Sequence, residues 1–112
     1  MDKTYYITTP IYYPSAKPHM GHAYSSIIAD FFARFKIIDG YQVHFLTGTD
    51  EHGLKIQRSA EKEGIDPKSF CDEISKTFKE LSKILNLSNN DFIRTTEARH
   101  KKTVQHLWNE LE

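Results

Sequence analysis

Two short polar segments carry the residues whose types and spacing could do chemistry. The first is Pro18-His19-Met20-Gly21-His22, which sets two imidazoles beside a glycine, and the second is Gly48-Thr49-Asp50-Glu51-His52-Gly53. Imidazole N–H groups can donate to oxygens whose negative charge grows as a phosphate is attacked, and donors held in place lower such a barrier without a proton transfer. The first segment therefore indicates phosphate chemistry.

The setting of the first segment supports this interpretation. A helical pattern follows it, and the free N–H groups and dipole at a helix N-terminus favour an anion. Gly21 has no Cβ, so a flat base or a ribose could approach the backbone closely. We expect the two imidazoles to flank the phosphate and Met20 to point inward as packing. The alternative is that His19 and His22 are surface or capping residues. Neither a G-x-G-x-x-G nor a G-x-x-x-x-G-K-[ST] run is present, so dinucleotide and P-loop modes lack support.

Both polar segments follow predicted strands. Aromatic and β-branched residues at 5–9 predict a strand buried on both faces, and residues 42–47 predict a second strand. Between them, apolar residues recur every three or four positions and predict a helix from His22 that closes at Asp39-Gly40. Its wide apolar face is formed by Tyr24, Ile27, Ile28, Phe31, Phe35 and Ile38.

The rest of the chain continues the alternation of strands and helices. This order predicts an α/β fold, a Rossmann-like parallel sheet with helical crossovers. Ligands of such sheets bind outside the carboxyl ends of the strands, so the two polar segments are expected to border one cleft. The remaining predicted elements are a helix at 54–63 ended by Gly64, a helix with Asp66 as N-cap and Pro67 in its first position, a turn at 86–90, a strand at 91–94, and a final helix capped by Thr96 with an apolar face around Trp108.

Composition narrows the classes of protein. The chain has 112 residues, of which 38% are apolar, and this suits one small domain or part of a larger one. Its formal net charge is zero, so the bulk charge gives no indication of nucleic-acid binding. Cys71 is the only cysteine; it has no activating neighbour, and no Cys/His cluster has zinc spacing. No signal-peptide core or membrane-crossing run is present, and we expect a cytoplasmic protein with no membrane partner.

Four motifs resemble one enzyme family. His19-Met20-Gly21-His22 resembles the His-Ile-Gly-His signature of class I aminoacyl-tRNA synthetases. The methionyl-tRNA synthetases of that class look similar at three further stretches, which are Thr8-Thr9-Pro10-Ile11-Tyr12-Tyr13, Leu46-Thr47-Gly48-Thr49-Asp50-Glu51-His52-Gly53 and Asp91-Phe92-Ile93-Arg94-Thr95-Thr96-Glu97. The resemblance covers almost the whole chain. It implies that residues 1–112 are the N-terminal half of a class I synthetase catalytic domain, cut at its C-terminal end.

The resemblance implies an enzyme that joins methionine to ATP, releases pyrophosphate and passes the methionyl group to tRNA(Met). ATP would be a substrate, with Mg²⁺ expected and no zinc site in this segment. The adenosine and the α-phosphate would lie against His19, Gly21 and His22, and the two histidines would be catalytic.

The resemblance also implies an amino-acid site. The methionine side chain would lie against Pro10, Ile11 and Tyr13, which suit an apolar wall with one polar tip. The methionine ammonium group would bind Asp50 through a charge-assisted hydrogen bond. Simple loop packing is the alternative role for Tyr13, and an N-cap for the following helix is the alternative role for Asp50.

Neighbouring residues have less defined roles. His52 could contact substrate or brace its loop, and both remain open. Glu51 is expected to serve a helix dipole. Tyr12 could belong to the core and is not assigned.

The chain departs from the family pattern in what it lacks. It has no Lys-Met-Ser-Lys-Ser run, which in the family stabilises the leaving pyrophosphate, and no cysteine-rich knuckle. We therefore expect the isolated chain to be inactive, and to leave apolar surface uncovered. Two alternatives remain open, namely a small H-x-G-H nucleotidyltransferase acting on another substrate, and a non-catalytic half domain that binds a nucleotide or a partner.

Overall fold

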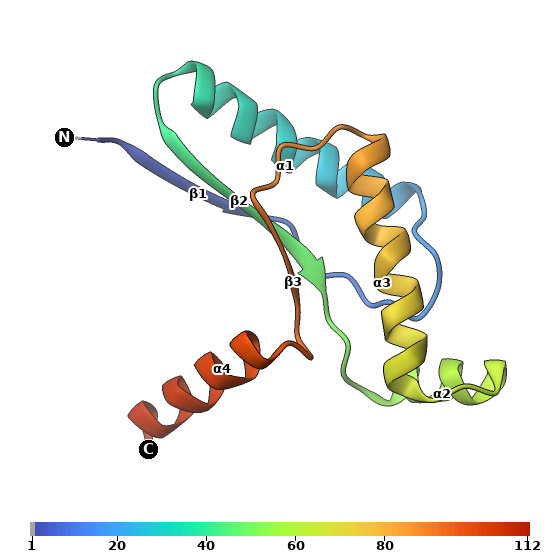
Figure 1. Cartoon of the computed structure of the whole chain (residues 1–112). Helices are drawn as coiled ribbons and strands as arrows, with labels where there is room; N and C mark the ends of the chain where they lie inside the picture. The colour runs from blue at the N-terminus through green and yellow to red at the C-terminus, as the bar shows by residue number, and fades with distance from the viewer. Residues whose placement is uncertain (1) are drawn as a thin grey trace.

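The computed structural model describes residues 2–112 and contains three strands, each followed by one or two of the four helices (Figure 1). Every strand and helix predicted from the sequence is present, and the fold class is confirmed. In chain order the elements are β1 (Thr4–Thr8), α1 (Met20–Ile38), β2 (Gln42–Thr49), α2 (Leu54–Glu63), α3 (Pro67–Ile84), β3 (Asp91–Arg94) and α4 (Ala98–Leu111).

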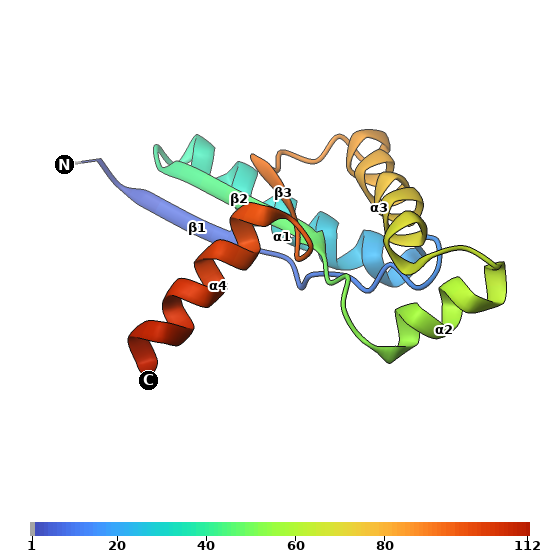
Figure 2. The same cartoon turned by 60° about the horizontal axis from the view of Figure 1, so that its bottom comes forward.

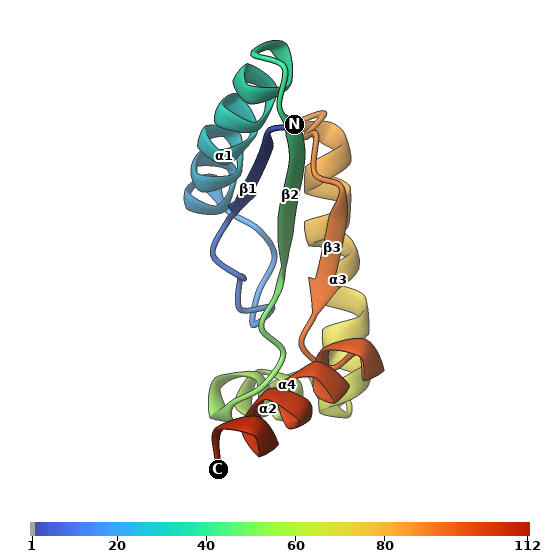
Figure 3. The same ribbon diagram turned by 90° about the vertical axis from the view of Figure 1, so that its left-hand side faces the viewer.

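The sheet is parallel throughout, with the strand order β1-β2-β3. Ile7 pairs with Phe45 in the first ladder, and Gly48 pairs with Ile93 in the second. A Cβ on Gly48 would lie 2.0 Å from the Ile93 carbonyl oxygen, so only glycine allows β2 and β3 to approach this closely. Because all strands run the same way, their carboxyl ends share one edge, and the loops after β1, β2 and β3 meet there (Figure 3).

Small residues attach α1 to the sheet. Ala29 and Ala33 of α1 pack against Phe45 of β2 in one core cluster, and Ser26 is buried beside them on the same helix. The large apolar residues of α1 point away from this contact. Exposed fractions reach 64% at Phe31 and 85% at Ile38. The predicted helix is therefore confirmed, but its apolar face lies on the surface of the chain.

A second core cluster joins α2 to α3 and consists of Ile56, Ala60, Phe70 and Cys71. The start of α3 follows the prediction, because the Asp66 side chain accepts hydrogen bonds from the backbone N–H groups of Lys68 and Ser69. Pro67 occupies the first turn, where its missing N–H leaves no intrahelical bond unmade.

Strand β1 corrects one prediction. A strand buried on both faces was expected at 5–9, but Thr4, Tyr6 and Thr8 are exposed. In this chain β1 is the edge of the sheet and pairs only with β2. Its aromatic and β-branched composition predicts a strand but does not reveal which neighbours cover it.

Helix α4 corrects another prediction from the sequence. Its N-cap is Glu97 rather than Thr96, because the Thr96 hydroxyl donates to the Glu51 carboxylate instead. The helix projects away from the sheet (Figure 2) and buries none of its residues. Its apolar face, with Trp108 65% exposed, is uncovered as expected.

No helix within residues 2–112 is long and apolar enough to cross a membrane.

Candidate active site

The first polar segment forms the start of α1, and its two histidines cap the helix. The His19 Nδ1 atom accepts a hydrogen bond from the Gly21 backbone N–H at 3.0 Å. The His22 Nδ1 atom accepts one from the His19 backbone N–H, also at 3.0 Å. An imidazole that accepts at Nδ1 carries its proton on Nε2, so both rings are neutral and each keeps one N–H donor free.

The two rings stack on each other, with centroids 3.8 Å apart and planes 27° from parallel. No gap separates them in this structure, which differs from the arrangement expected for two imidazoles on either side of a phosphate. An anion could meet only the outer Nε2 edges of the pair. Met20 is 84% exposed, which also corrects the expectation that it packs inward.

Gly21 has a role that the sequence did not reveal. A Cβ at this position would lie 2.9 Å from the His19 Cε1 atom and 3.1 Å from its Nδ1 atom. The absent side chain thus makes room for the His19 ring in its capping position. The pKa of His22 is lowered by partial burial, and the neighbouring His19 lowers it further. Both effects favour the neutral ring that the cap requires.

Tyr12 ties the loop after β1 to the end of β2. Its backbone N–H donates to the Gly48 carbonyl at 3.0 Å, and its carbonyl accepts from the Asp50 N–H at 2.9 Å. Its hydroxyl lies 3.0 Å from the Ser26 hydroxyl on α1. Tyr12 is buried, as its possible core role allowed. It holds Asp50 beside Ile11 and Tyr13 and joins both polar segments.

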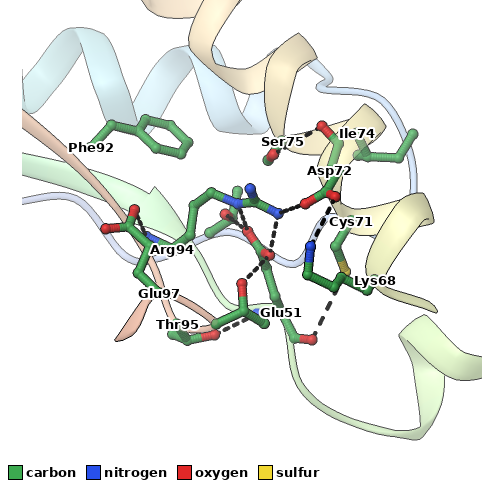
Figure 4. A network of polar contacts seen from close by, with 12 residues as sticks. Glu51, Lys68, Cys71, Asp72, Ile74, Ser75, Phe92, Arg94, Thr95 and Glu97 are labelled. Carbon is green, nitrogen blue, oxygen red and sulfur yellow. Dashed lines mark hydrogen bonds and ion pairs between the residues drawn. The ribbon is translucent and has the colours of Figure 1, made fainter. Parts of the chain in front are cut away.

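The residue after Asp50, Glu51, forms a partly buried ion pair with Arg94 (Figure 4). The Arg94 Nε and Nη2 atoms donate to the two Glu51 oxygens at 2.7 and 2.8 Å. The hydroxyls of Thr49 and Thr96 donate to the same carboxylate at 2.6 and 2.8 Å. The same Arg94 Nη2 atom also donates to the Asp72 carboxylate of α3 at 2.6 Å. Glu51 therefore joins three elements rather than serving a helix dipole, which corrects that prediction.

The charges of this cluster stabilise each other. Burial alone would raise the pKa of the Glu51 carboxyl, but hydrogen bonds from Arg94, Thr49 and Thr96 outweigh burial and lower it. Glu51 stays ionised at neutral pH as a result. Burial, reinforced by the negative charge of Glu51, raises the pKa of the nearby Cys71 thiol to about 11. Cys71 is thus a protonated, buried thiol, which is consistent with an inert role.

A cleft of about 320 Å³ lies between the loop after β1 and the start of α1. Larger clefts of about 420 and 430 Å³ contain neither imidazole and lie beside α3 instead. Lys17 and Lys55 line the smaller cleft, and neither forms an ion pair with another residue of the 2–112 segment. The full lining is Ile11, Tyr12, Tyr13, Ser15, Ala16, Lys17, His19, His22 and Lys55.

The structure brings most of the expected site residues to one edge of the sheet. Four of them line the cleft, whereas Pro10 and Gly21 are exposed beside it. Asp50 does not line the cleft, and it reaches this group through the backbone of Tyr12. Asp50 is not a helix cap, because the N-cap of α2 is Gly53 and no side chain makes a capping hydrogen bond there. The four expected residues in the lining are Ile11, Tyr13, His19 and His22.

His52 is exposed, and its Nδ1 atom lies 3.1 Å from the Thr95 hydroxyl. This contact holds the loop after β2, and bracing that loop is one of the two roles that the sequence left open for His52. Lysines 17 and 55 and the Glu51–Arg94 pair were missed from the sequence. The only signal for the pair was an acidic residue just after one predicted strand and a basic residue at the end of another. Charge alone does not pair residues this far apart in the chain.

A parallel sheet with a His-x-Gly-His helix start at its carboxyl edge is the arrangement of a class I synthetase domain. The family described as tRNA synthetases class I (M) matches residues 5–112, and the chain belongs to this family. Within it the chain is similar to methionine–tRNA ligases. One from Rickettsia bellii is 53% identical over 111 residues, which is 99% of this chain. One from Listeria monocytogenes is 55% identical over 108 residues, or 96% of this chain.

Solved structures agree with this assignment. Methionyl-tRNA synthetase from Mycobacterium tuberculosis, bound by methionyl-adenylate, matches with a TM-score of 0.94 and 48% identity over 96% of this chain and 21% of that one. The LeuRS of Agrobacterium radiobacter K84, in a ternary complex with tRNA and LeuAMS, matches with a TM-score of 0.85 and 26% identity over 98% of this chain and 14% of that one. The chain spans 22% of the Rickettsia relative's length and 16% of the Listeria relative's.

Proposed function

We propose that this chain forms the methionine- and ATP-binding part of a methionine–tRNA ligase. The observation that carries the proposal is the double backbone link at Tyr12, which sets Asp50 beside Ile11 and Tyr13 at the same sheet edge as the His19–His22 pair. An amine-binding carboxylate and a pair of phosphate donors then lie at one edge. The M. tuberculosis relative bound by methionyl-adenylate, which joins the same two chemical groups, supports this interpretation.

In the amino-acid half, Asp50 binds the methionine ammonium group. Pro10, Ile11 and the half-exposed Tyr13 ring provide apolar surface for the thioether side chain. A carboxylate–ammonium hydrogen bond is about twice as strong as a neutral one, so it fixes the orientation of the bound amino acid.

In the nucleotide half, the Nε2–H groups of His19 and His22 donate to the α-phosphate, and Gly21 keeps the His19 ring in place. Lys17 and Lys55 supply positive charge for the outer phosphates. Mg²⁺ would arrive bound to ATP, where it neutralises phosphate charge. The residues of the 2–112 segment include no group of three His, Cys, Asp or Glu that could cage it, and the cleft lining contains no carboxylate.

The first step then needs positioning rather than a protein nucleophile. A methionine carboxylate oxygen attacks the α-phosphorus, a new P–O bond forms, and the bond to pyrophosphate breaks with its electron pair leaving on the pyrophosphate. The two Nε2–H donors stabilise the charge that grows on the α-phosphate oxygens. A later transfer of the methionyl group to tRNA(Met), and a cytoplasmic location, belong to the same proposal.

The test uses a segment chimaera, in which this chain replaces the matching 108 residues of the Listeria monocytogenes relative. We expect methionine to drive exchange of labelled pyrophosphate into ATP, and leucine and isoleucine to drive none. The isolated 112-residue chain is expected to show no exchange, because it lacks the Lys-Met-Ser-Lys-Ser run that faces the leaving group in the family. A folded chimaera that prefers another amino acid, or shows no exchange at all, would contradict the proposal.

A further inference from the structure

We infer that the ion pair between the buried Glu51 and the partly buried Arg94 positions the methionine-binding carboxylate, and that its geometry determines methionine affinity without touching the substrate. The inference rests on the proposed role of Asp50. It assigns a positioning function to Glu51, Arg94 and Thr49, in place of the helix-dipole role that the sequence suggested for Glu51.

Thr49 and Glu51 flank Asp50 in the chain, and both side chains are buried. Glu51 directly follows Asp50, and its side chain is fully buried, with 0% exposed. Thr49 directly precedes Asp50 and is also fully buried. The Thr49 hydroxyl donates to the Glu51 carboxylate at 2.6 Å, so these two side chains lie on one side of the extended backbone. Alternation along such a backbone directs the Asp50 side chain to the opposite side.

Hydrogen bonds from two loops hold the backbone around Asp50. The Asp50 N–H donates to the Tyr12 carbonyl at 2.9 Å, and the Glu51 N–H donates to the Thr95 hydroxyl at 2.8 Å. Glu51 is further held by the two-pronged contact from Arg94 (Figure 4). Hydrogen bonds thus hold the Asp50 peptide from the loop after β1 on one side and from the loop after β3 on the other.

The energetics of the Glu51–Arg94 ion pair favour a role in positioning over a role in stability alone. A buried ion pair is often no more stabilising than apolar side chains of similar volume, because two charges lose their water. A requirement for stability alone therefore does not explain a pair at this position. The directed hydrogen bonds of the Glu51–Arg94 pair fix the position of the neighbouring Asp50 backbone, which apolar packing would leave less well defined. An amino-acid site benefits from this, because a misplacement of about 1 Å can cost about a hundredfold in rate.

The test compares variants in the segment chimaera. Glu51→Gln keeps the shape of the side chain and removes its charge, and Arg94→Lys keeps the charge but loses the planar fork. We expect both to raise the half-saturating methionine concentration at least about tenfold, with the half-saturating ATP concentration changing less than about twofold. A purely structural role would shift both concentrations together.

Two further variants at Thr49 distinguish the loss of one hydrogen bond from misfolding of the chain. Thr49→Val removes the hydroxyl at nearly constant volume, and Thr49→Ser restores it. Methionine half-saturation should rise for the valine variant and return close to the parent value for the serine variant. Asp91→Asn is the matched control, because it breaks the Arg99–Asp91 ion pair at the other end of β3, and it should leave both concentrations unchanged.

The outcomes separate the two claims. If the parent chimaera shows no methionine-dependent exchange, the proposed function fails. If the parent is active but Glu51→Gln and Thr49→Val shift neither concentration, or shift methionine and ATP equally, the positioning inference is wrong and the proposed function stands.

Discussion

His19 and His22 each use one ring nitrogen to cap α1 and leave the other ring nitrogen free to donate. Both Nδ1 atoms accept capping hydrogen bonds at the start of α1, which sets the proton of each ring on Nε2. The same contacts that start the helix therefore prepare two donors at its N-terminus. This dual use explains why neutral rings suit the site, since a doubly protonated imidazole cannot accept at Nδ1.

Gly21→Ala tests this dual use. On an ordinary helix the change would stabilise by about 0.5–1 kcal/mol. Here the new Cβ would lie 2.9 Å from the His19 ring, which must move and lose its cap at a cost of about 1 kcal/mol. We expect these effects to nearly cancel in a urea titration of the chain, while the half-saturating ATP concentration of the chimaera rises about tenfold or more. An unchanged ATP dependence would show that the ring position is unimportant.

Acid should weaken the start of α1. Burial and the neighbouring His19 lower the pKa of His22 in the folded chain below its unfolded value near 6.5. The unfolded chain therefore binds the proton more readily. The stabilisation from the neutral ring is complete above pH 6.5 and is lost as the pH falls from there toward the folded pKa.

His22→Gln isolates this effect from the other histidines. Glutamine at the third helical position can accept the same capping hydrogen bond and does not titrate. As the pH falls below 6.5, the thermal midpoint of the parent chain should decrease more steeply than that of the glutamine variant. Parallel pH profiles would contradict the assignment.

At the scale of elements, periodicity and capping chemistry were sufficient to predict the fold. Asp66 and Pro67 start α3 as their residue types indicate, and Gly40 follows α1 with a positive φ of 86°. The errors share a physical cause, because local patterns do not encode long-range partners. Thr96 was expected to cap α4 but donates to Glu51, which lies 45 residues earlier. The large apolar face of α1 could not be placed, because periodicity shows that a face exists and not what covers it.

The site was predictable to a similar extent. The strand-end positions of His19, His22 and Asp50 could be expected from the topology of parallel sheets. The stacking of the two rings could not, because it depends on side-chain torsions. The Glu51–Arg94 contact also could not, since it joins the ends of two different strands.

Gly48→Ala tests the close contact between β2 and β3. Its Cβ would meet the Ile93 carbonyl at 2.0 Å, so the two strands must separate. We expect the free energy of unfolding to fall by about 3 kcal/mol in a urea titration. Gly64→Ala is the control, because its Cβ would meet nothing within 4 Å and only its positive φ is disfavoured. That variant should lose about 1 kcal/mol. Equal losses would show that the β2–β3 spacing is not limiting.

At the scale of the whole molecule, the chain is flat, with Cα extents of 51 × 40 × 17 Å. Its thin shape leaves apolar side chains of α1 and α4 on the surface. Exposed fractions are 64% at Phe31, 58% at Leu107 and 65% at Trp108. Exposed apolar helix faces of this kind promote association.

We therefore expect the 112-residue chain to self-associate as its concentration rises. A Leu107→Lys, Trp108→Glu double variant should shift sedimentation toward the monomer, because both changes charge the exposed face of α4. His106→Lys adds a charge on the same helix without removing apolar surface and should have little effect. A parent chain that stays monomeric at high concentration would contradict this expectation.

We propose that loops from two strand ends form one site, in which Asp50 binds the amino acid and the histidines bind the nucleotide. Methionine titration of pyrophosphate exchange, at saturating ATP, measures this most directly in the segment chimaera and its Asp50→Ala variant. We predict that the variant raises the half-saturating methionine concentration about tenfold to a hundredfold, as expected for the loss of a hydrogen bond to a charged group, and leaves that of ATP unchanged. An unchanged methionine half-saturation would contradict the claim.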